Sequence, residues 1–461
     1  MNEFRMLSTS GILGYGFAEE SLKIGMTWEP HVIGCDGGST DPGPYYLGSG
    51  KSFTSRLSVK RDLRLMLMAA VAARIPCIIG TSGGAGGEPH LQDTAALVRE
   101  IAREEGLSFK MALIHSEQPK DWLCDRIAEE KTRPLGKMKP LDQATVDRAE
   151  RIVGMMGPEP FARALDEGAQ VILAGRSSDP AQWAAPAMRA GIPPAPAWYA
   201  GKMLECGAEP TIPKEPDNIF LRVRDDHIVC EPPNPIRRST PLAVANFALH
   251  ENASPIHHTE PGGLLDTSAC TFEAISDRAV RVGGMTWTPA STYTVKLEGV
   301  ERVGYRAITI CGTRDPVLIG QIDSYLETHR RTVATKAASF GVPPSDYTMV
   351  VRTYGKDGVM AAWEPQKAIT SHELGFVVEI VGRTQDIANA VVAMARTSML
   401  HADFAGRLCK EGNMAFPFSP SDIELGAMYR FSIFHVVAPK DPYEMFPIEY
   451  ETVRGYHAAH R

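Results

Sequence analysis

Short apolar runs that end in glycine-rich loops are the feature that most constrains the fold of this chain. In the N-terminal part, apolar runs at 32–33, 77–79 and 171–173 alternate with segments of helical spacing such as 61–73 and 90–105. Continuous apolar runs are typical of parallel strands buried on both faces, and their alternation with helices is typical of βαβ units. The sequence therefore predicts an α/β fold with an N-terminal parallel sheet that has helices on both faces.

The pattern changes near residue 218, where β-type runs no longer alternate with helices. The runs 220–223 and 227–230 are separated by three polar residues, which indicates a hairpin. Further β-type runs follow and add antiparallel character. We therefore expect the first domain to span 1–290, with 218–290 as a β-rich extension.

Residues 291–461 predict a second domain with a different order of elements. A strand, a helix, two strands, a helix and a strand follow one another, which is the βαββαβ order of the ferredoxin-like fold. The predicted strands are 307–311, 348–353, 375–381 and 428–437, and the predicted helices are 316–339 and 384–400.

The two helices of such a domain can cover only one face of its sheet. Ile308, Ile310, Val350 and Val378 offer apolar side chains for one of the two faces. We expect that face to pack on the N-terminal domain or on a symmetry mate. The chain is therefore expected to form a homo-oligomer, most simply a homodimer.

The composition excludes several classes of protein. The 461 residues are 44% hydrophobic and 22% charged, as in an ordinary globular protein with a large core. No apolar run approaches the roughly 18–20 residues that cross a bilayer. The net charge of -7 argues against a nucleic acid or an anionic membrane as the partner. Eight cysteines without a zinc-like spacing are typical of free thiols in a reducing compartment, so we expect a cytoplasmic location.

Three loops, 34–46, 81–90 and 175–180, each follow a predicted parallel strand and combine glycine with hydroxyl and acidic residues. The carboxyl ends of parallel strands form the ligand crevice of open α/β sheets. We therefore expect the loops to converge on one cleft that binds a carboxylate, a phosphate or a CoA thioester. The candidate anion-binding residues are Gly37, Gly38, Ser39, Thr40, Ser82, Gly83, Gly84, Arg176, Ser177 and Ser178.

Asp36, Ser82 and Ser178 are expected around this common cleft. A local explanation for the same residues remains open, because βα loops need glycine and helix caps in any protein. On that reading, Ser178 and Asp179 only cap the helix that begins at Pro180.

Acidic and histidine residues supply the candidates for acid–base catalysis. Asp36 and Asp41 flank the first glycine-rich loop. If 256–260 is extended, His258 and Glu260 point to one face of the strand. A histidine with a carboxylate suits a general base with its orienting partner, or two ligands of a divalent metal. No four-ligand zinc site is evident, and a divalent metal remains an alternative, as does a merely solvated loop.

Two sequence motifs, one typical of a catalytic serine and one typical of nucleotide binding, are incomplete. Gly80-Thr81-Ser82-Gly83-Gly84 has the spacing of a nucleophile elbow, but the next helix is expected only near His90. Gly48-Ser49-Gly50-Lys51-Ser52 ends like a P-loop, but Tyr45 occupies the position of the first glycine. No G-x-G-x-x-G motif opens the chain, so no nicotinamide or nucleotide cofactor is indicated.

The same residues resemble the acyclic terpene utilisation (AtuA) family. The resemblance rests on Gly37 to Gly50, with support from 83–87, 175–180 and 260–263. It implies an AtuA domain that is followed, in some members, by a ferredoxin-like domain. It also implies a role in the catabolism of branched terpenoid acids and other small carboxylic acids. The resemblance assigns no catalytic residue.

These observations favour an enzyme acting on a small branched carboxylic acid or its CoA thioester. A hydratase, dehydratase or isomerase would use an acid–base pair beside the anion-binding loops. One alternative is a serine hydrolase that uses Ser82 with His257 or His258. Another is a non-catalytic subunit or scaffold of a catabolic complex.

Overall fold

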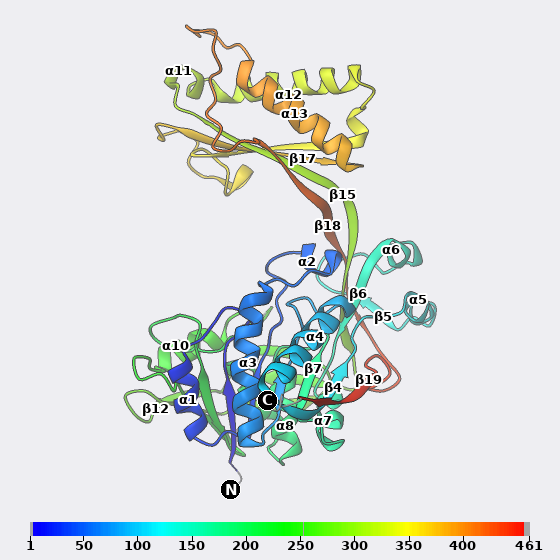
Figure 1. Ribbon diagram of the computed structural model, residues 1–461, viewed down its shortest axis with the longest axis vertical. Coiled ribbons are helices and arrows are strands. Elements are labelled where there is room, and N and C mark those ends of the chain that lie inside the picture. Colours follow the sequence, from blue (N-terminus) through cyan, green and yellow to red (C-terminus); the bar gives the residue numbers. More distant parts are fainter. Residues whose placement is uncertain (1–2, 252, 456–461) are drawn as a thin grey trace, which may run out of the picture. The chain divides into compact units, whose positions relative to one another are not determined.

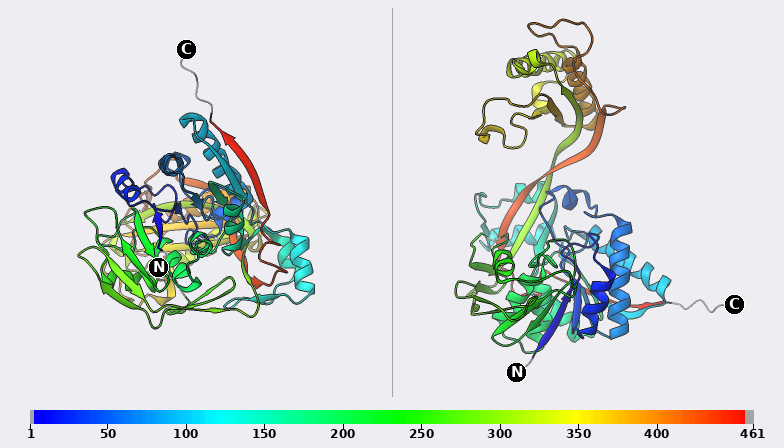
Figure 2. Two further views of the ribbon diagram at one scale, coloured as in Figure 1. Left: turned by 90° about the horizontal axis from the view of Figure 1, so that it is seen from below. Right: turned by 90° about the vertical axis from the view of Figure 1, so that its left-hand side faces the viewer.

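The computed structural model describes residues 3–251 and 253–455, in two compact units (Figure 1). The first unit comprises 1–301 and 431–461, and the second comprises 302–430. This division differs from the predicted boundary after residue 290, and the end of the chain returns to the first unit. The reason is β19 (Ile448–Arg454), which pairs antiparallel with β4 (Ser108–Ile114) at the edge of the first unit's sheet (Figure 2).

A sheet of ten strands organises the first unit, in the order β12-β13-β9-β8-β1-β2-β3-β7-β4-β19. Within this order, the five neighbouring strands β1-β2-β3-β7-β4 run parallel, as predicted for the N-terminal part. The β-rich segment continues the same sheet with antiparallel pairs, starting where β8 pairs with β1. The strands are β1 (Phe4–Ser8), β2 (Val32–Cys35), β3 (Cys77–Ile79), β7 (Val171–Ala174), β8 (Ile219–Val223), β9 (His227–Glu231), β12 (Thr271–Ala274) and β13 (Val280–Gly283).

Helices cover both faces of this sheet because alternate strand residues enter two separate cores. Ile78 and Ile172 lie in one core with residues of α7, α8 and α9. Their neighbours Ile79 and Leu173 lie in the other core with residues of α1, α3 and α4. The helices are α1 (Glu19–Thr27), α2 (Tyr45–Ser49), α3 (Arg56–Ala73), α4 (Glu88–Glu105), α5 (Lys120–Ala128), α6 (Gln143–Arg148), α7 (Glu159–Asp166), α8 (Ala181–Arg189), α9 (Pro194–Leu204) and α10 (Pro241–Ala248).

Further strands lie outside this ten-stranded sheet. A three-stranded sheet contains β10 (His257–Glu260), β11 (Gly263–Asp266) and β14 (Thr286–Pro289). Another sheet has the order β16-β17-β15-β18-β5, and β6 also pairs with β15. Its strands are β5 (Thr132–Pro134), β6 (Ala149–Met155), β15 (Val295–Thr313), β16 (Tyr347–Tyr354), β17 (Leu374–Gly382) and β18 (Asp422–Val437). None of the helices in the described ranges is long and apolar enough to cross a membrane.

In the second unit, two long helices pack on one side of the sheet. They are α12 (Ile322–Ser339) and α13 (Gln385–His401), and the short α11 (Pro316–Ile319) precedes them (Figure 1). Val378 lies in the core with these helices. Ile308 and Val350 both pair with Glu379, the next residue of β17, and therefore point to the opposite face. The prediction that Val378 shares a face with Ile308, Ile310 and Val350 was wrong, because successive strand residues alternate between faces.

Replacing valine with threonine at two positions tests this assignment of faces. Val378 is fully buried, so Val378→Thr should lower the stability of the second unit by about 1–3 kcal/mol, because the hydroxyl loses water. The matched control Val350→Thr is at a position 39% exposed and should change stability by no more than about 0.5 kcal/mol. Thermal melts of both variants provide the measurement. Equal losses at the two positions would contradict the assignment.

Candidate functional site

The glycine-rich loops after β2, β3 and β7 meet at the carboxyl ends of these adjacent parallel strands. The Ser39 N–H donates to the Gly84 carbonyl at 3.0 Å, which joins the first loop to the second. The Ser82 N–H donates to the Gly175 carbonyl at 3.1 Å, which joins the second loop to the third. The three loops therefore form one continuous surface at the edge where an open α/β sheet binds its ligand.

A cavity of about 320 Å³ opens beside these loops, and we call it the loop-end cavity. Its volume lies within the usual range for small-molecule sites. One part of its wall is aliphatic, and the rest carries hydroxyl groups, two cations and one carboxylate. The lining residues are Ile12, Leu13, Gly37, Lys51, Ser52, Thr54, Arg56, Val59, Thr81, Gly83, Gly84, Asp93, Thr94 and Leu97.

A tight turn from Ser82 to Gly86 contributes backbone donors to this wall. The Gly86 N–H donates to the Ser82 carbonyl at 3.0 Å. Within the described residues, the three N–H groups that the turn encloses, from Gly83 to Ala85, find no hydrogen-bond acceptor. Gly83 and Gly84 have φ values of +60° and +86°, which favour glycine. Consecutive free N–H groups of this kind suit an anion or a developing oxyanion.

His90 holds the segment that carries Lys51 against this turn. The Gly87 N–H donates to Nδ1 of His90 at 3.1 Å, so Nε2 carries the ring proton and donates to the Lys51 carbonyl at 3.0 Å. Burial lowers the pKa of His90, which keeps the ring neutral. Among the described residues, Lys51 has no carboxylate partner, so its ammonium group is available to a ligand.

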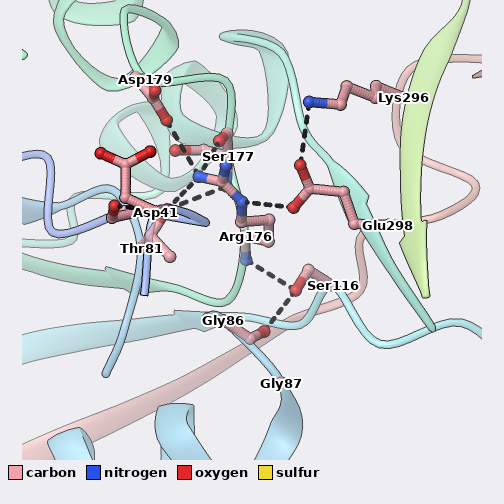
Figure 3. A network of polar contacts seen from close by, with 12 residues as sticks. Asp41, Thr81, Gly86, Gly87, Ser116, Arg176, Ser177, Asp179, Lys296 and Glu298 are labelled. Carbon is pink, nitrogen blue, oxygen red and sulfur yellow. Dashed lines mark hydrogen bonds and ion pairs between the residues drawn. The ribbon is translucent and has the colours of Figure 1, made fainter. Parts of the chain in front are cut away.

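Arg176 lies at the centre of a buried polar network on the other side of Thr81 (Figure 3). Its Nε donates to Glu298 at 3.1 Å, and its Nη1 donates to Asp179 at 3.0 Å. Nη1 also lies 3.4 Å from Oγ1 of Thr81, which lines the loop-end cavity. Although burial acts to raise it, Arg176 and Lys296 hold the pKa of Glu298 below its usual value. The predicted anion-binding side chain of Arg176 therefore already neutralises carboxylates of the protein.

Asp36 is a buried carboxyl group directly before Gly37 of the cavity wall. Its Oδ2 accepts from the Gly38 N–H at 3.3 Å, and its Oδ1 has no partner among the described residues. Burial and the charge of Asp179 raise the pKa of Asp36 well above its usual value, against the opposing charge of Arg176. The raised pKa favours the protonated form of this buried carboxyl group, which suits general-acid chemistry.

Two more carboxyl groups with raised pKa lie near Asp179. Burial raises the pKa of Glu205 to about 8, although Lys202 is hydrogen-bonded to it. Lys202 also donates to the His250 carbonyl at 2.7 Å. Burial raises the pKa of Glu260 to about 7, and the Ser178 hydroxyl donates to this carboxyl group. Because perturbed carboxyl groups gather at functional sites, this cluster extends the candidate site beyond the cavity.

The structure separates the predicted pair of His258 and Glu260. The alternation of β10 places both on one face, as expected, with His258 buried and His257 exposed. Nε2 of His258 has no partner among the described residues, and burial lowers the pKa of His258 to about 4. Glu260 instead bonds to Ser178. The two residues therefore do not form a base with its orienting carboxylate.

Other predicted site residues have local partners. Asp41 is exposed; burial raises the pKa of Glu251, and the negative charge of Asp41 adds to this rise. Ser82 is fully buried and donates to the Ala174 carbonyl at 2.7 Å, so its hydroxyl does not face the cavity as a nucleophile would. Of the predicted anion-binding residues, the cavity wall contains Gly37, Gly83 and Gly84, and it does not contain Gly38, Ser39, Thr40, Ser82, Arg176, Ser177 or Ser178.

Several residues of the site were missed in the sequence. Lys51 belongs to Gly48-Ser49-Gly50-Lys51-Ser52, whose lysine beside glycines is a signal even without a complete P-loop. Lys202 and Glu205 belong to no sequence motif, because only folding brings them close to Asp179 in the loop 175–180. Across residues 3–251 and 253–455, no group of three or more histidine, cysteine, aspartate or glutamate residues is placed to hold a metal ion.

The fold and the cavity define an α/β protein with a cavity at the carboxyl ends of its parallel strands. Residues 57–211 match the sequence model of the family described as acyclic terpene utilisation family protein AtuA. This match confirms, over residues 57–211, the family resemblance predicted from the sequence. The matched segment includes the loops after β3 and β7. No curated protein and no solved structure gives a significant match.

The raised pKa of Glu260 predicts a dependence of stability on pH. The pKa of about 7 in the folded protein exceeds the usual 4.5, so the folded state holds a proton that the unfolded state loses as pH rises between these values. The contribution of Glu260 to the free energy of unfolding is therefore complete below pH 4.5 and decreases as the pH rises to about 7. Glu260→Gln resembles the protonated form. The difference in melting temperature, variant minus wild type, should therefore be larger at pH 8 than at pH 5.

Glu20→Gln, on the exposed surface of α1, is the control for loss of a carboxylate. Melting curves of the three proteins at the two pH values provide the measurement. A Glu260→Gln variant whose melting temperature relative to the wild type is the same at both pH values would contradict the buried, protonated carboxyl group.

Proposed function

We propose that this chain is a catabolic enzyme acting on a small branched carboxylic acid or its CoA thioester, as a hydratase, dehydratase or isomerase. The family description associates its members with acyclic terpene utilisation, a catabolic role. The observation that supports the finer proposal is the composition of the loop-end cavity. It combines an aliphatic wall with free backbone donors and the ammonium group of Lys51.

The cavity suits a ligand with one polar end and a short branched hydrocarbon. The carboxylate or thioester oxygen would lie against the N–H groups of Gly83 and Gly84 and the ammonium group of Lys51. The hydrocarbon would pack on Ile12, Leu13 and the other aliphatic residues of the wall. Backbone donors at this oxygen would also stabilise an enolate formed by loss of a proton next to the carbonyl.

Asp36 is the proposed general acid of the reaction. Burial raises its pKa, which favours the form that carries a proton, and it directly precedes Gly37 of the cavity wall. It would protonate a departing hydroxyl group in a dehydration, or the γ-carbon of a dienolate in a double-bond isomerisation. Glu260, whose pKa is about 7, is a second candidate for acid–base chemistry. The proposal does not involve the buried hydroxyl of Ser82.

The second unit is proposed to be a ferredoxin-like domain. The order β15, α12, β16, β17, α13 and β18 along the chain supports this assignment, as does the strand order β16-β17-β15-β18. The sheet face opposite the helices carries Ile308, Ile310 and Val350. We propose this face as the contact of a homodimer, which light scattering of the full chain would detect.

Replacing Lys51 tests the binding site. Lys51→Met keeps most of the side-chain length and removes the charge, so the affinity for 3-methylbutanoate should fall about 10-fold or more. Isothermal titration calorimetry measures the affinity. Lys23→Met, at an exposed lysine of α1, is the matched control and should bind as the wild type does. Unchanged binding by Lys51→Met would exclude this cavity as the carboxylate site.

Replacing Asp36 tests the proposed general acid. Asp36→Asn retains the size and an acceptor but cannot donate an acidic proton, so turnover should fall about 10²-fold or more. The assay follows the absorbance of a conjugated, branched unsaturated CoA thioester during hydration or isomerisation. Thioester affinity and melting temperature should remain close to those of the wild type. Normal turnover of Asp36→Asn would remove Asp36 from the mechanism.

A further inference from the structure

A groove of about 670 Å³ lies in the second unit, and we call it the basic groove. Its wall is formed by residues of two segments, 314–320 after β15 and 367–372 before β17. We propose that the basic groove binds an organic dianion, most simply a phosphate monoester with a short hydrocarbon part. The inference goes beyond the proposed function, because it concerns a different ligand and a different unit of the chain.

The charges on the wall of the basic groove have one sign. Arg314, Lys367 and His372 line the groove, and no aspartate or glutamate does. The whole chain has a net charge of -7, so this gathering of basic residues runs against its overall composition. A phosphate monoester carries nearly two negative charges at neutral pH. Two permanent cations with a histidine beside them match such a head group.

The basic side chains of the groove differ from other arginines of the second unit in having no carboxylate partner. Across residues 3–251 and 253–455, the side chains of Arg314 and His372 form no hydrogen bond and no ion pair. By contrast, Arg306 and Arg352 both form ion pairs with Glu379. The positive charge of the groove is therefore not balanced by the protein itself.

The carboxylates nearest in the chain are engaged elsewhere. Asp315 follows Arg314, but its carboxylate accepts from two backbone N–H groups at the start of α11, at 2.8 Å and 3.3 Å. Lys367 donates to the backbone carbonyl of Glu364 at 2.6 Å. The carboxylate of Glu364 accepts instead from a backbone N–H two residues further on, at 3.0 Å. The charges of Arg314 and Lys367 therefore remain available to a ligand.

The wall between these cations is apolar and preformed. Ile319 and Ile369 are half-buried and pack against the core of the second unit, which fixes their positions before any ligand arrives. Pro316 adds a further apolar side chain to the wall. Apolar surface beside cations suits a ligand whose hydrocarbon part lies next to its anionic group. The groove volume is within the usual range for small-molecule sites.

Calorimetry of the full chain with three probes tests the inference: hexyl phosphate, inorganic phosphate and hexylammonium. Hexyl phosphate should bind about 5-fold or more tightly than inorganic phosphate, because the groove covers part of its hydrocarbon chain. Hexylammonium has the same chain and the opposite charge, so it should bind at least about 10-fold more weakly than hexyl phosphate.

Two variants locate the site. Arg314→Gln and Lys367→Gln should each weaken the binding of hexyl phosphate about 5-fold or more. Both side chains are exposed, so the melting temperatures should remain close to that of the wild type. Arg331→Gln and Lys336→Gln, at exposed positions of α12 outside the groove, are the matched controls and should bind as the wild type does.

Several results would overturn the basic groove as an anion site. They are equal binding of hexyl phosphate and hexylammonium, unchanged binding by both Arg314→Gln and Lys367→Gln, and no measurable binding of hexyl phosphate. Equal affinity for hexyl phosphate and inorganic phosphate would overturn the role of the hydrocarbon part. If Lys51→Met abolishes binding of hexyl phosphate and Arg314→Gln does not, the phosphate occupies the loop-end cavity and the inference fails. The proposed function is tested separately, by the affinity of the loop-end cavity for 3-methylbutanoate.

Discussion

The burial of Arg176 is the constraint on which the candidate site depends. A guanidinium group that is 3% exposed persists only where carboxylates and hydrogen-bond acceptors surround it. Glu298 reaches it from β15, Asp179 comes from its own loop, and Thr81 comes from the loop after β3. One buried charge therefore joins three separate parts of the chain. The position of Thr81 in the cavity wall follows from this arrangement.

The same charge balance explains why neighbouring carboxyl groups have raised pKa values. Arg176 is bonded to Glu298 and Asp179, so it offsets only part of the burial cost at Asp36. Lys202 is likewise insufficient to keep Glu205 ionised at neutral pH. An excess of buried carboxyl groups over cations thus favours protonated carboxyl groups in this cluster. Proton donors beside an apolar cavity are what chemistry next to a carboxyl group needs.

Close backbone contacts allow these loops to come together. A Cβ atom at Gly37 would lie 2.4 Å from the Thr81 carbonyl oxygen. A Cβ atom at Gly86 would lie 2.4 Å from the Gly175 carbonyl oxygen. Glycine at these positions lets the loops after β2, β3 and β7 approach one another, and it leaves the turn after Ser82 with free donors. The glycine content thus serves loop packing as well as ligand access.

The sequence by itself determined the parallel strands, the three glycine-rich loops and the resemblance to the AtuA family over residues 57–211. These features are local, because strand burial and turn conformation are encoded in short runs of residues. The tertiary structure alone decided which side chains face the cavity. Ser82 lies in the right loop yet points to a carbonyl, whereas Lys51 enters the wall through contacts with His90.

Long-range pairing decided the rest. The return of β19 to β4 depends on contacts between distant segments, which the local pattern of residues 291–461 does not reveal. Val378 was assigned to the wrong face because a single residue of register inverts the exposure of a strand. The raised pKa values of Glu205 and Glu260 arise from burial beside Asp179, and burial is a property of the folded chain.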